Sequence, residues 1–211
     1  MSHTVSPRKR GRPPKSGRDF QDTRELLCRA GMAAFTEKGF SALGIDEIVT
    51  SVGVPKGSFY HFFASKEAFG IEVIQRYKAY FARKLDQHLL DTRVTPLQRV
   101  MAFCRDAESG MAKFDYRRGC LVGNLGQEMG TLPASFRALL IEVLNDWQHR
   151  TEHCLLAAKA AGEISPDADC ARWSSFFWIG WEGAVLRAKL ECRGEPLQTF
   201  ARLFQEMLPR Q

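Results

Sequence analysis

Residues 39–63 decide the fold, and they read GFSALGIDEIVTSVGVPKGSFYHFF. Two short apolar stretches at 45–52 and 56–63 are separated by Gly53-Val54-Pro55, a sequence that ends one helix and allows the next to begin. Two short helices joined in this way are typical of a helix-turn-helix. The apolar side chains that we expect to fix the angle between these helices are Ile45, Ile48, Val52, Val54 and Phe59.

The second of these helices carries hydrogen-bond donors at its N-terminal end. These donors are Lys56, Ser58, Tyr60 and His61. Gly57 keeps the start of the helix slim, so that its backbone can approach a groove of DNA. Donors at the start of a recognition helix are what a helix-turn-helix presents to the major groove. A helical hairpin with an aromatic core would explain Phe59 and Phe62 but not this group of donors, so we expect DNA binding.

The rest of the chain is predicted to be almost entirely helical. Gly39 ends a first helix at 21–38, in the position after a helix where Gly is favoured. Ser65 is expected to be the N-cap of a long helix at 66–90, with Ala68 rather than a capping-box Glu at the third helical position. Further helices are expected at 95–113, 120–129, 133–162, 167–192 and 196–208. The fold class is therefore all-α, with about nine helices.

We expect three parts along the chain: a disordered basic arm at 1–19, a helix-turn-helix domain at 20–65 and a helical body at 66–211. The net charge is +6, of which +5 lies in the arm. A basic arm on a nearly neutral body indicates a polyanionic partner. Within the arm, Arg10-Gly11-Arg12-Pro13 resembles an AT-hook core, in which Arg10 and Arg12 lie along a narrow minor groove. The alternative is a basic tail without sequence preference.

Other classes of protein are disfavoured by the sequence. No apolar stretch approaches the roughly 18 residues of a membrane span, and no signal-peptide core is present, so we expect a cytoplasmic protein. The six cysteines are scattered, against a disulfide framework or a zinc cage. His149 and His153 lack a third metal ligand, and no P-loop or hydrolase motif occurs. We therefore expect no metal, no cofactor and no enzyme, with a catalytic body or an architectural DNA binder as weak alternatives.

The pattern Val52-Gly53-Val54-x-x-Gly57-x-x-Tyr60-x-Phe62-x-x-x-Lys66-Glu67 resembles the signature of the TetR family of dimeric, ligand-gated repressors. The resemblance implies a C-terminal domain that binds a ligand and dimerises. It also implies that one group of residues faces DNA: Lys56, Gly57, Ser58, Tyr60, His61 and Lys66. By type, Tyr60, His61 and Lys66 suit phosphates, whereas Lys56 and Ser58 reach bases. At the position of Gly44 the family usually has a Thr, which caps the helix and contacts a DNA phosphate. The sequence does not supply that contact from a side chain here.

Two C-terminal segments are predicted to form the dimer interface. Gly180, Ala184 and Ala188 recur every four residues, and such a ridge of small residues allows a second helix to approach closely. Phe176 and Phe177 extend its apolar surface. The last helix adds Leu197, Phe200, Ala201, Phe204 and Leu208 at helical spacing. The alternative is that both segments belong to the ordinary core of one chain.

Residues 117–130, RRGCLVGNLGQEMG, form the most unusual segment of the body. On a helix, Gly119, Gly123, Gly126 and Gly130 share one stripe. Each Gly costs about 1 kcal/mol relative to Ala in a helix interior, so we expect close packing or a pocket there. Cys120 lies near the predicted helix N-terminus beside Arg117 and Arg118, where dipole and charge favour the thiolate. Such a thiol suits a soft electrophile or a small carboxylate.

This segment and the 54–61 run resemble a TetR subgroup that includes the repressor of N-ethylmaleimide reductase and the acrylate-utilisation regulator. The resemblance implies release from DNA by acrylate or a related small unsaturated carbonyl compound, with Cys120 matching the subgroup's cysteine. A ligand would act by shifting the helix at 66–90. Alternatives are a thiol-based redox or electrophile sensor, and a purely structural thiol. Ligand-site candidates are Cys120, Asn124, Arg117, Trp178, Trp181 and Tyr77, with Tyr80, Phe81, Phe103 and Trp147 as further aromatic candidates.

Overall fold

The computed structural model describes residues 20–210, and within that range the regular structure is helical with no strand. The elements are α1 (Phe20–Lys38), α2 (Ile45–Ser51), α3 (Lys56–Phe62), α4 (Lys66–Leu89), α5 (Pro96–Ala112), α6 (Leu121–Gln127), α7 (Ala134–Ala160), α8 (Cys170–Glu191) and α9 (Glu195–Met207). The all-α prediction is confirmed. The arm with Arg10 and Arg12 lies outside the described residues.

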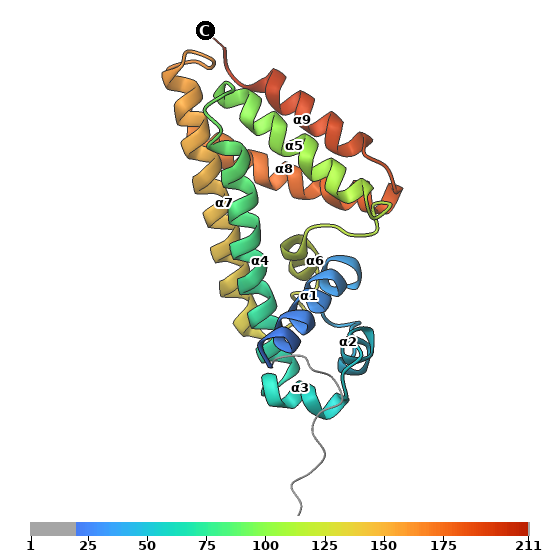
Figure 1. The fold of residues 1–211 in the computed structure, drawn as a ribbon. Helices are drawn as coiled ribbons and strands as arrows, with labels where there is room; N and C mark the ends of the chain where they lie inside the picture. The colour runs from blue at the N-terminus through green and yellow to red at the C-terminus, as the bar shows by residue number, and fades with distance from the viewer. Residues whose placement is uncertain (1–19, 211) are drawn as a thin grey trace, which may run out of the picture.

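The helices form an elongated molecule with a small and a large end (Figure 1). Helices α1, α2 and α3 form the small end, and α5, α8 and α9 lie together at the other. The long helices α4 and α7 run side by side between the two ends. Short α6 lies beside α1, between the small end and the layer of α5 and α8. The molecule therefore has two structures that link its ends, the α4–α7 pair and α6.

Local signals in the sequence fix the ends of the first helices. Gly39 follows α1 with a φ of +84°, a left-handed conformation that costs Gly little and other residues more. Gly53, between α2 and α3, has a φ of +67°. The Ser65 hydroxyl accepts a hydrogen bond of 3.0 Å from the backbone N–H of Ala68, so the predicted cap of α4 is confirmed. Gly44 precedes α2 and supplies no side-chain cap.

The predicted core of the helix-turn-helix is confirmed. Ile48 and Phe59 are buried, while Ile45, Val52 and Val54 are partly buried against the same cluster. The Phe59 ring also packs on two rings that belong to the start of α4 and the turn before it, Phe69 and Phe63. The orientation of α3 is thereby set by α4 as well as by α2.

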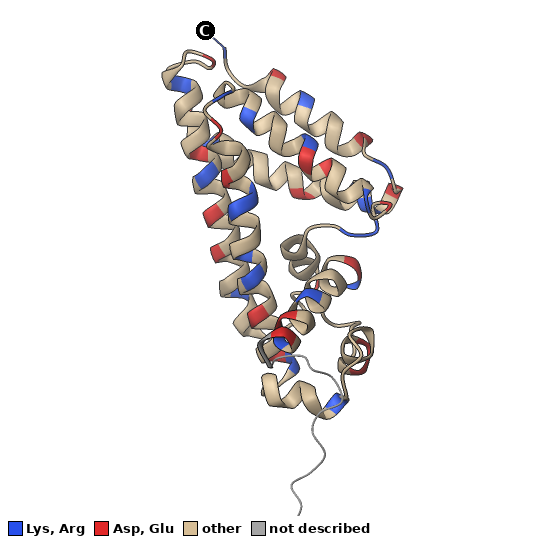
Figure 2. Cartoon of the chain, viewed as in Figure 1, with Lys and Arg blue, Asp and Glu red and all other residues tan. Residues whose placement is uncertain are grey.

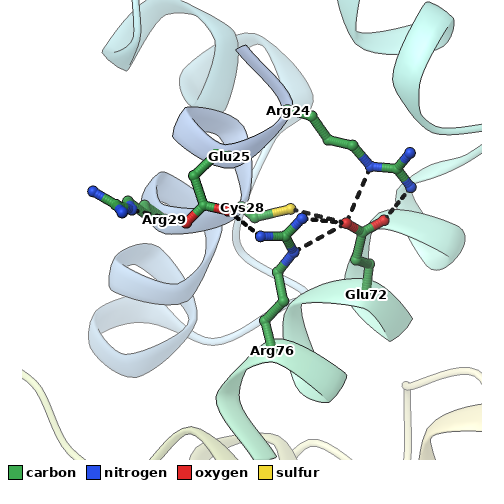
Figure 3. A network of polar contacts seen from close by, with 6 residues as sticks. All are labelled: Arg24, Glu25, Cys28, Arg29, Glu72 and Arg76. Carbon is green, nitrogen blue, oxygen red and sulfur yellow. Dashed lines mark hydrogen bonds and ion pairs between the residues drawn. The ribbon is translucent and has the colours of Figure 1, made fainter. Parts of the chain in front are cut away.

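A polar network fastens the first half of α1 to α4 (Figure 3). The Glu72 carboxylate of α4 accepts hydrogen bonds from Arg24 Nη2 at 2.5 Å and from Arg76 Nη2 at 2.9 Å. Arg76 also pairs with Glu25, and the Cys28 thiol lies 3.6 Å from Glu72 Oε1. Burial alone would raise the pKa of Glu72, but the hydrogen bonds from the two arginines outweigh it and lower that pKa. This half of α1 is therefore held to α4 by a charged cluster.

The prediction that the small residues of α8 face a dimer partner is wrong, because they are buried within the single chain and α9 covers Gly180. A Cβ at Gly180 would overlap the Phe200 ring of α9. Ala184, Ala188 and Phe177 are buried within the single chain. On α9, Leu197, Phe204 and Leu208 are buried as well. Small residues allow a close approach by any helix, and here the approaching helix is the next one along the chain.

Three further observations concern the described part of the chain as a whole. No helix among residues 20–210 is long and apolar enough to cross a membrane. In the same range, no group of three or more His, Cys, Asp and Glu side chains is arranged to hold a metal ion. Five of the six cysteines are buried and Cys192 is exposed, all six as free thiols.

Candidate functional site

The predicted DNA-contacting side chains lie on α3 and at the start of α4. Lys56, Gly57 and His61 are exposed, and Tyr60 is 54% exposed even though it neighbours buried Phe59. Helix α3 has a basic end and no acidic residue (Figure 2). The Lys56 ammonium lies 2.7 Å from the Asp46 carboxylate of α2. Exposed pairs of this kind contribute little stability, so a phosphate can replace the carboxylate as partner.

Lys66 differs from the other predicted DNA contacts because it is already engaged within the chain. Its ammonium donates a hydrogen bond of 2.7 Å to the backbone oxygen of Phe40 and lies 4.3 Å from the centroid of the Phe40 ring. Partial burial lowers the pKa of Lys66. Lys66 therefore links the start of α4 to the turn after α1, a contact that its sequence position did not indicate.

A cavity of about 510 Å³ lies in the body. Residues of α1, α4, α5 and α8 line it, together with the segment before α6. Three predicted ligand-site residues meet there: Tyr77, Cys120 and Trp181. Tyr80 and Phe81 add aromatic surface from α4. The structure thus brings the cysteine segment and α4 into one cavity, although they are some forty residues apart in sequence.

Three other predicted ligand-site residues do not line this cavity. Trp178 lies in the core, where its indole N–H donates a hydrogen bond of 3.0 Å to the Thr151 hydroxyl. Arg117 is exposed and pairs with Asp115, and its neighbour Arg118 lines the cavity instead. Asn124 borders only a small adjoining recess, with its side chain toward α1. Phe103 and Trp147 are likewise core residues.

Glu182 is the most informative cavity residue that the sequence analysis missed. It lies on α8 and lines the cavity beside Cys120. Burial raises the pKa of the Glu182 carboxyl to about 7, because no cation offsets the loss of water. The available signal was its position in an apolar stretch, Trp178-Ile179-Gly180-Trp181-Glu182-Gly183-Ala184, where a lone carboxylate is unusual.

Cys120 is a protonated thiol, and the prediction of a thiolate is wrong. Burial and the nearby Glu182 raise the pKa of Cys120 well above its ordinary value. Its sulfur caps α6 by accepting a hydrogen bond from the Gly123 N–H at 3.5 Å, and the Tyr77 hydroxyl approaches it at 3.8 Å. The expected positive neighbours point elsewhere, since Arg118 pairs with Glu37 and stacks on a ring.

Of the four glycines predicted to share one stripe, Gly123 is the one that another side chain approaches closely. Helix α6 runs from Leu121 to Gln127, so Gly119 lies before it and Gly130 after it. Gly126 has open space where a side chain would be. At Gly123, by contrast, a Cβ would overlap the Glu182 carboxylate and would lie 3.7 Å from the Cys120 Cβ. Gly123 therefore allows Glu182 to approach the backbone at the start of α6.

Four residues around α6 hold the end of α1 and the turn that follows, and we call them the α1 clasp: Gly119, Asn124, Glu128 and Lys189. The Asn124 amide donates hydrogen bonds to the backbone oxygens of Phe35 at 3.0 Å and Thr36 at 2.7 Å. The Gly119 N–H donates to Thr36 O at 2.9 Å. The Lys189 ammonium of α8 donates to Glu37 O at 2.9 Å.

The remaining member of the α1 clasp acts on the turn between α1 and α2. The Glu128 carboxylate accepts hydrogen bonds from the backbone N–H groups of Phe40 at 3.0 Å and Ser41 at 2.7 Å. The start of α6 therefore borders the cavity. Farther along, Asn124 and Glu128 contact the helix-turn-helix domain. A displacement at the cavity end of α6 would reach the helix-turn-helix along one short helix.

Comparisons with known proteins agree with this architecture. Residues 27–73 match the sequence profile described as bacterial regulatory proteins, tetR family, and residues 96–204 match the profile described as tetracyclin repressor-like, C-terminal domain. The transcriptional regulator AcuR of Cereibacter sphaeroides is 54% identical over 196 residues, which cover 93% of this chain and 89% of AcuR. The transcriptional repressor NemR of Escherichia coli K12 is 31% identical over 188 residues, covering 84% and 89%.

A solved structure resembles the whole described fold. The crystal structure of a regulatory protein TetR from Rhodobacter sphaeroides superposes with a TM-score of 0.86 at 54% sequence identity. The superposition covers 87% of this chain and 97% of that one. The likeness therefore extends over both the helix-turn-helix end and the helical body.

Proposed function

The chain belongs to the TetR family of bacterial transcriptional regulators, and from this premise we propose that it represses genes by binding a palindromic operator as a dimer. We propose further that acrylate, or a related small unsaturated carbonyl compound, enters the cavity beside Cys120 and releases the protein from DNA. One observation carries the proposal: the residue that caps α6, Cys120, lines the cavity, and the next turn of the same helix holds the helix-turn-helix.

The chemistry of the cavity suits a small carboxylic acid with an apolar carbon chain. Tyr77, Cys120 and Glu182 supply polar groups at one end, and Trp181 and Phe81 supply apolar surface. A protonated thiol is a poor nucleophile. Because burial holds the pKa of Cys120 high, we propose reversible binding of the ligand rather than covalent capture. An electrophile sensor would need that pKa to fall when the cavity is occupied.

Two connections lead from the cavity to α3. Helix α4 contributes Tyr77, Tyr80 and Phe81 to the cavity wall and packs against Phe59 of α3 at its other end. Helix α6 connects through the α1 clasp. The ligand shifts the equilibrium only if it binds one arrangement of these helices more tightly than the other. We propose that the cavity with ligand favours a displaced α6, which loosens the end of α1 and changes the separation of the two α3 helices in the dimer.

The exposed face of α8 offers a dimer surface in place of the ridge predicted from sequence. Phe176, Ile179, Leu186 and Leu190 are exposed at spacings of three, seven and four residues, with Ile179 at 72% and Leu190 at 74%. Helix α9 adds exposed Leu203 and Met207. Apolar residues in such a repeat are typical of a helix that packs against other helices. A two-fold dimer formed through this face presents two α3 helices to two half-sites.

For DNA recognition we propose the contacts that the side chains on α3 favour. Lys56 and Ser58 contact bases, while Tyr60 and His61 contact phosphates. Lys66 joins them only if it exchanges its bond to Phe40 O for a phosphate. In the arm, Arg10 and Arg12 contact the minor groove. A protein with this role acts in the cytoplasm, where bacterial DNA lies.

The test is DNA binding by fluorescence anisotropy, with the region upstream of the chain's own gene as the labelled duplex. We expect acrylate to release the wild-type protein and also Cys120→Ser, at a higher concentration for the variant because a smaller hydroxyl replaces the sulfur. Propionate has the carboxylate but no double bond to which a thiol can add, so it reports on carboxylate recognition alone. N-ethylmaleimide reports on thiol chemistry. If both proteins bind DNA and no unsaturated compound affects either, the proposed ligand class is wrong.

A further inference from the structure

The end of the cavity at the start of α6 carries three acidic groups, and none of them forms an ion pair with a residue between 20 and 210. The Tyr77 hydroxyl, the Cys120 thiol and the Glu182 carboxyl lie together there. Burial and their mutual proximity raise the pKa of both Tyr77 and Cys120, so these two groups are neutral at physiological pH. A carboxylate that reaches this end therefore meets neutral hydrogen-bond donors and one group, Glu182, that is able to carry a negative charge.

Three of the four cations that line the cavity already have acidic partners. Lys84 lies 3.0 Å from the Asp106 carboxylate, which His88 also contacts. Arg29 pairs with Glu25 at 2.9 Å. Arg118 Nε lies 3.4 Å from a Glu37 carboxylate oxygen, and its guanidinium stacks on the exposed Phe114 ring at 4.0 Å. Lys113, at the C-terminal end of α5, is exposed and has no acidic partner among the described residues.

Charged groups on the elements packed around Glu182 are engaged with other partners, although Lys189 borders the same small recess as Glu182. Lys189, on α8 itself, donates to the backbone of α1 and lies 3.5 Å from Asn124 Oδ1. Helix α6 has no charged residue, and the nearby titratable group on its first turn is the Cys120 thiol. Helix α4 presents Tyr77 and, farther along, Lys84 in its pair with Asp106. Glu182 itself makes no ion pair with any residue between 20 and 210.

We propose that Glu182 receives the carboxylate of the ligand as a neutral carboxylic acid, so that each ligand anion is taken up together with one proton. This inference rests on the proposed function and names the chemistry by which the same cavity selects its ligand. The proton comes from solvent and resides on a Glu182 oxygen, from which it forms an O–H···O⁻ hydrogen bond to the ligand. No covalent bond of the ligand breaks. Two carboxylates that share a buried site share one proton, because two negative charges there repel each other.

The pKa of about 7 for Glu182 supports this arrangement. A carboxyl with that pKa is about half protonated near neutral pH, so the proton required for binding is available without a large cost. Above pH 7 the free protein carries Glu182 as a carboxylate, and each ligand that binds must bring a proton from solution. Affinity for an anionic ligand therefore falls as the pH rises above 7, by about tenfold per unit once Glu182 is fully ionised.

The opposite orientation makes different predictions. A ligand carboxylate held by Lys84 or Arg118 would place the vinyl group near Cys120. In that arrangement Glu182 has no reason to gain a proton, and affinity would not depend on its ionisation. A count of protons taken up on binding therefore distinguishes the two orientations.

The experiment is isothermal titration calorimetry of acrylate into the full-length protein at pH 6, 7, 8 and 9. Each pH is measured in two buffers with different enthalpies of ionisation, which yields the number of protons taken up per ligand. We expect uptake of about 0.9 proton at pH 8 and about 0.1 at pH 6, together with a dissociation constant that rises about tenfold from pH 8 to pH 9. Propionate should take up the same number of protons, and neutral acrylamide should take up none.

Two variants test whether the proton resides on Glu182. Glu182→Gln keeps a hydrogen-bond donor at the position but does not titrate, so we expect binding that is independent of pH between 6 and 9, without proton uptake. Glu142→Gln is the matched control: it removes a carboxylate that pairs with Lys78, and neither residue lines the cavity. This control should take up protons as the wild type does.

Several results would overturn the inference. Binding of acrylate to the wild type at pH 8 without proton uptake would do so, and so would unchanged uptake in Glu182→Gln. Failure of acrylate and propionate to bind at all would overturn both this inference and the proposed ligand class. Binding with proton uptake but without release of DNA would leave the role of Glu182 in place and contradict the proposed function.

Discussion

Asn124→Ala removes from α6 the side chain that holds the C-terminal end of α1. Its amide donates to Phe35 O at 3.0 Å and Thr36 O at 2.7 Å. Both oxygens keep other donors after the substitution, since Gly39 N–H donates to Phe35 O and Gly119 N–H to Thr36 O. No buried acceptor is therefore left unpaired, and Lys189, which loses its long contact of 3.5 Å to Asn124 Oδ1, keeps its bond to Glu37 O. The loss is then mainly the net value of the two hydrogen bonds to α1, about 1–2 kcal/mol. For a chain of this size, that corresponds to a fall in Tm of roughly 2–8 °C.

The same free energy should also affect communication between cavity and DNA. If α6 transmits the ligand signal through the α1 clasp, the ratio of DNA affinities without and with acrylate should fall by up to about 5- to 30-fold in Asn124→Ala, because 1.36 kcal/mol corresponds to a factor of ten. Fluorescence anisotropy with operator DNA measures that ratio, and urea unfolding measures the stability.

The control variant is Gln127→Ala, one turn along the same helix. Gln127 is exposed and its amide donates only to the Gly123 backbone oxygen within α6, at 3.3 Å. It should leave both stability and coupling close to wild type. An Asn124→Ala protein that is destabilised as expected, yet shows unchanged coupling, would refute transmission through α6 and favour α4.

Three further predictions concern the turn after α1, the dimer surface and the buried carboxyl. Gly39→Ala should destabilise the chain by about 2–3 kcal/mol in urea unfolding, because φ is +84° and the new Cβ would overlap Glu128; a loss below about 0.5 kcal/mol would contradict the geometry. Ile179→Asp combined with Leu190→Asp should yield monomers by analytical ultracentrifugation and weaken DNA binding at least tenfold, because charges replace two exposed apolar residues; an intact dimer would place the interface elsewhere. Glu182→Gln should gain stability relative to wild type between pH 5 and pH 8, by up to about 3 kcal/mol. The reason is that folding raises the pKa of Glu182, so the wild-type chain loses stability as the pH rises from about 4.5 to 7. Equal differences at the two pH values in urea unfolding would show that Glu182 titrates normally.

The helix-turn-helix could be predicted because its signals are local. Gly53, Pro55 and Ser65 act within a few residues of their own positions, through backbone conformation or a single capping bond. The alternation of apolar and polar residues in α2 and α3 is equally local, and the buried positions of Ile48 and Phe59 follow from it. Such features do not depend on what the distant chain does.

The errors came from contacts between distant segments. Gly180 and Ala188 indicate a close helix approach, but the sequence does not say whether the approaching helix belongs to a second copy or to α9. Arg118 lies two positions before Cys120 in the sequence, yet its side chain contacts Glu37 and the Phe114 ring. The group that dominates the Cys120 environment is Glu182, which lies 62 positions later in the chain.

The most direct test of the central claim is the affinity of the protein for acrylate with and without saturating operator DNA. Two sites that are coupled must influence each other by the same factor, whichever ligand is varied. We predict that acrylate binds the DNA complex more weakly than the free protein, by the same factor by which acrylate weakens DNA binding. Equal acrylate affinity in the two states would contradict the account, because a ligand that binds both states equally releases no DNA.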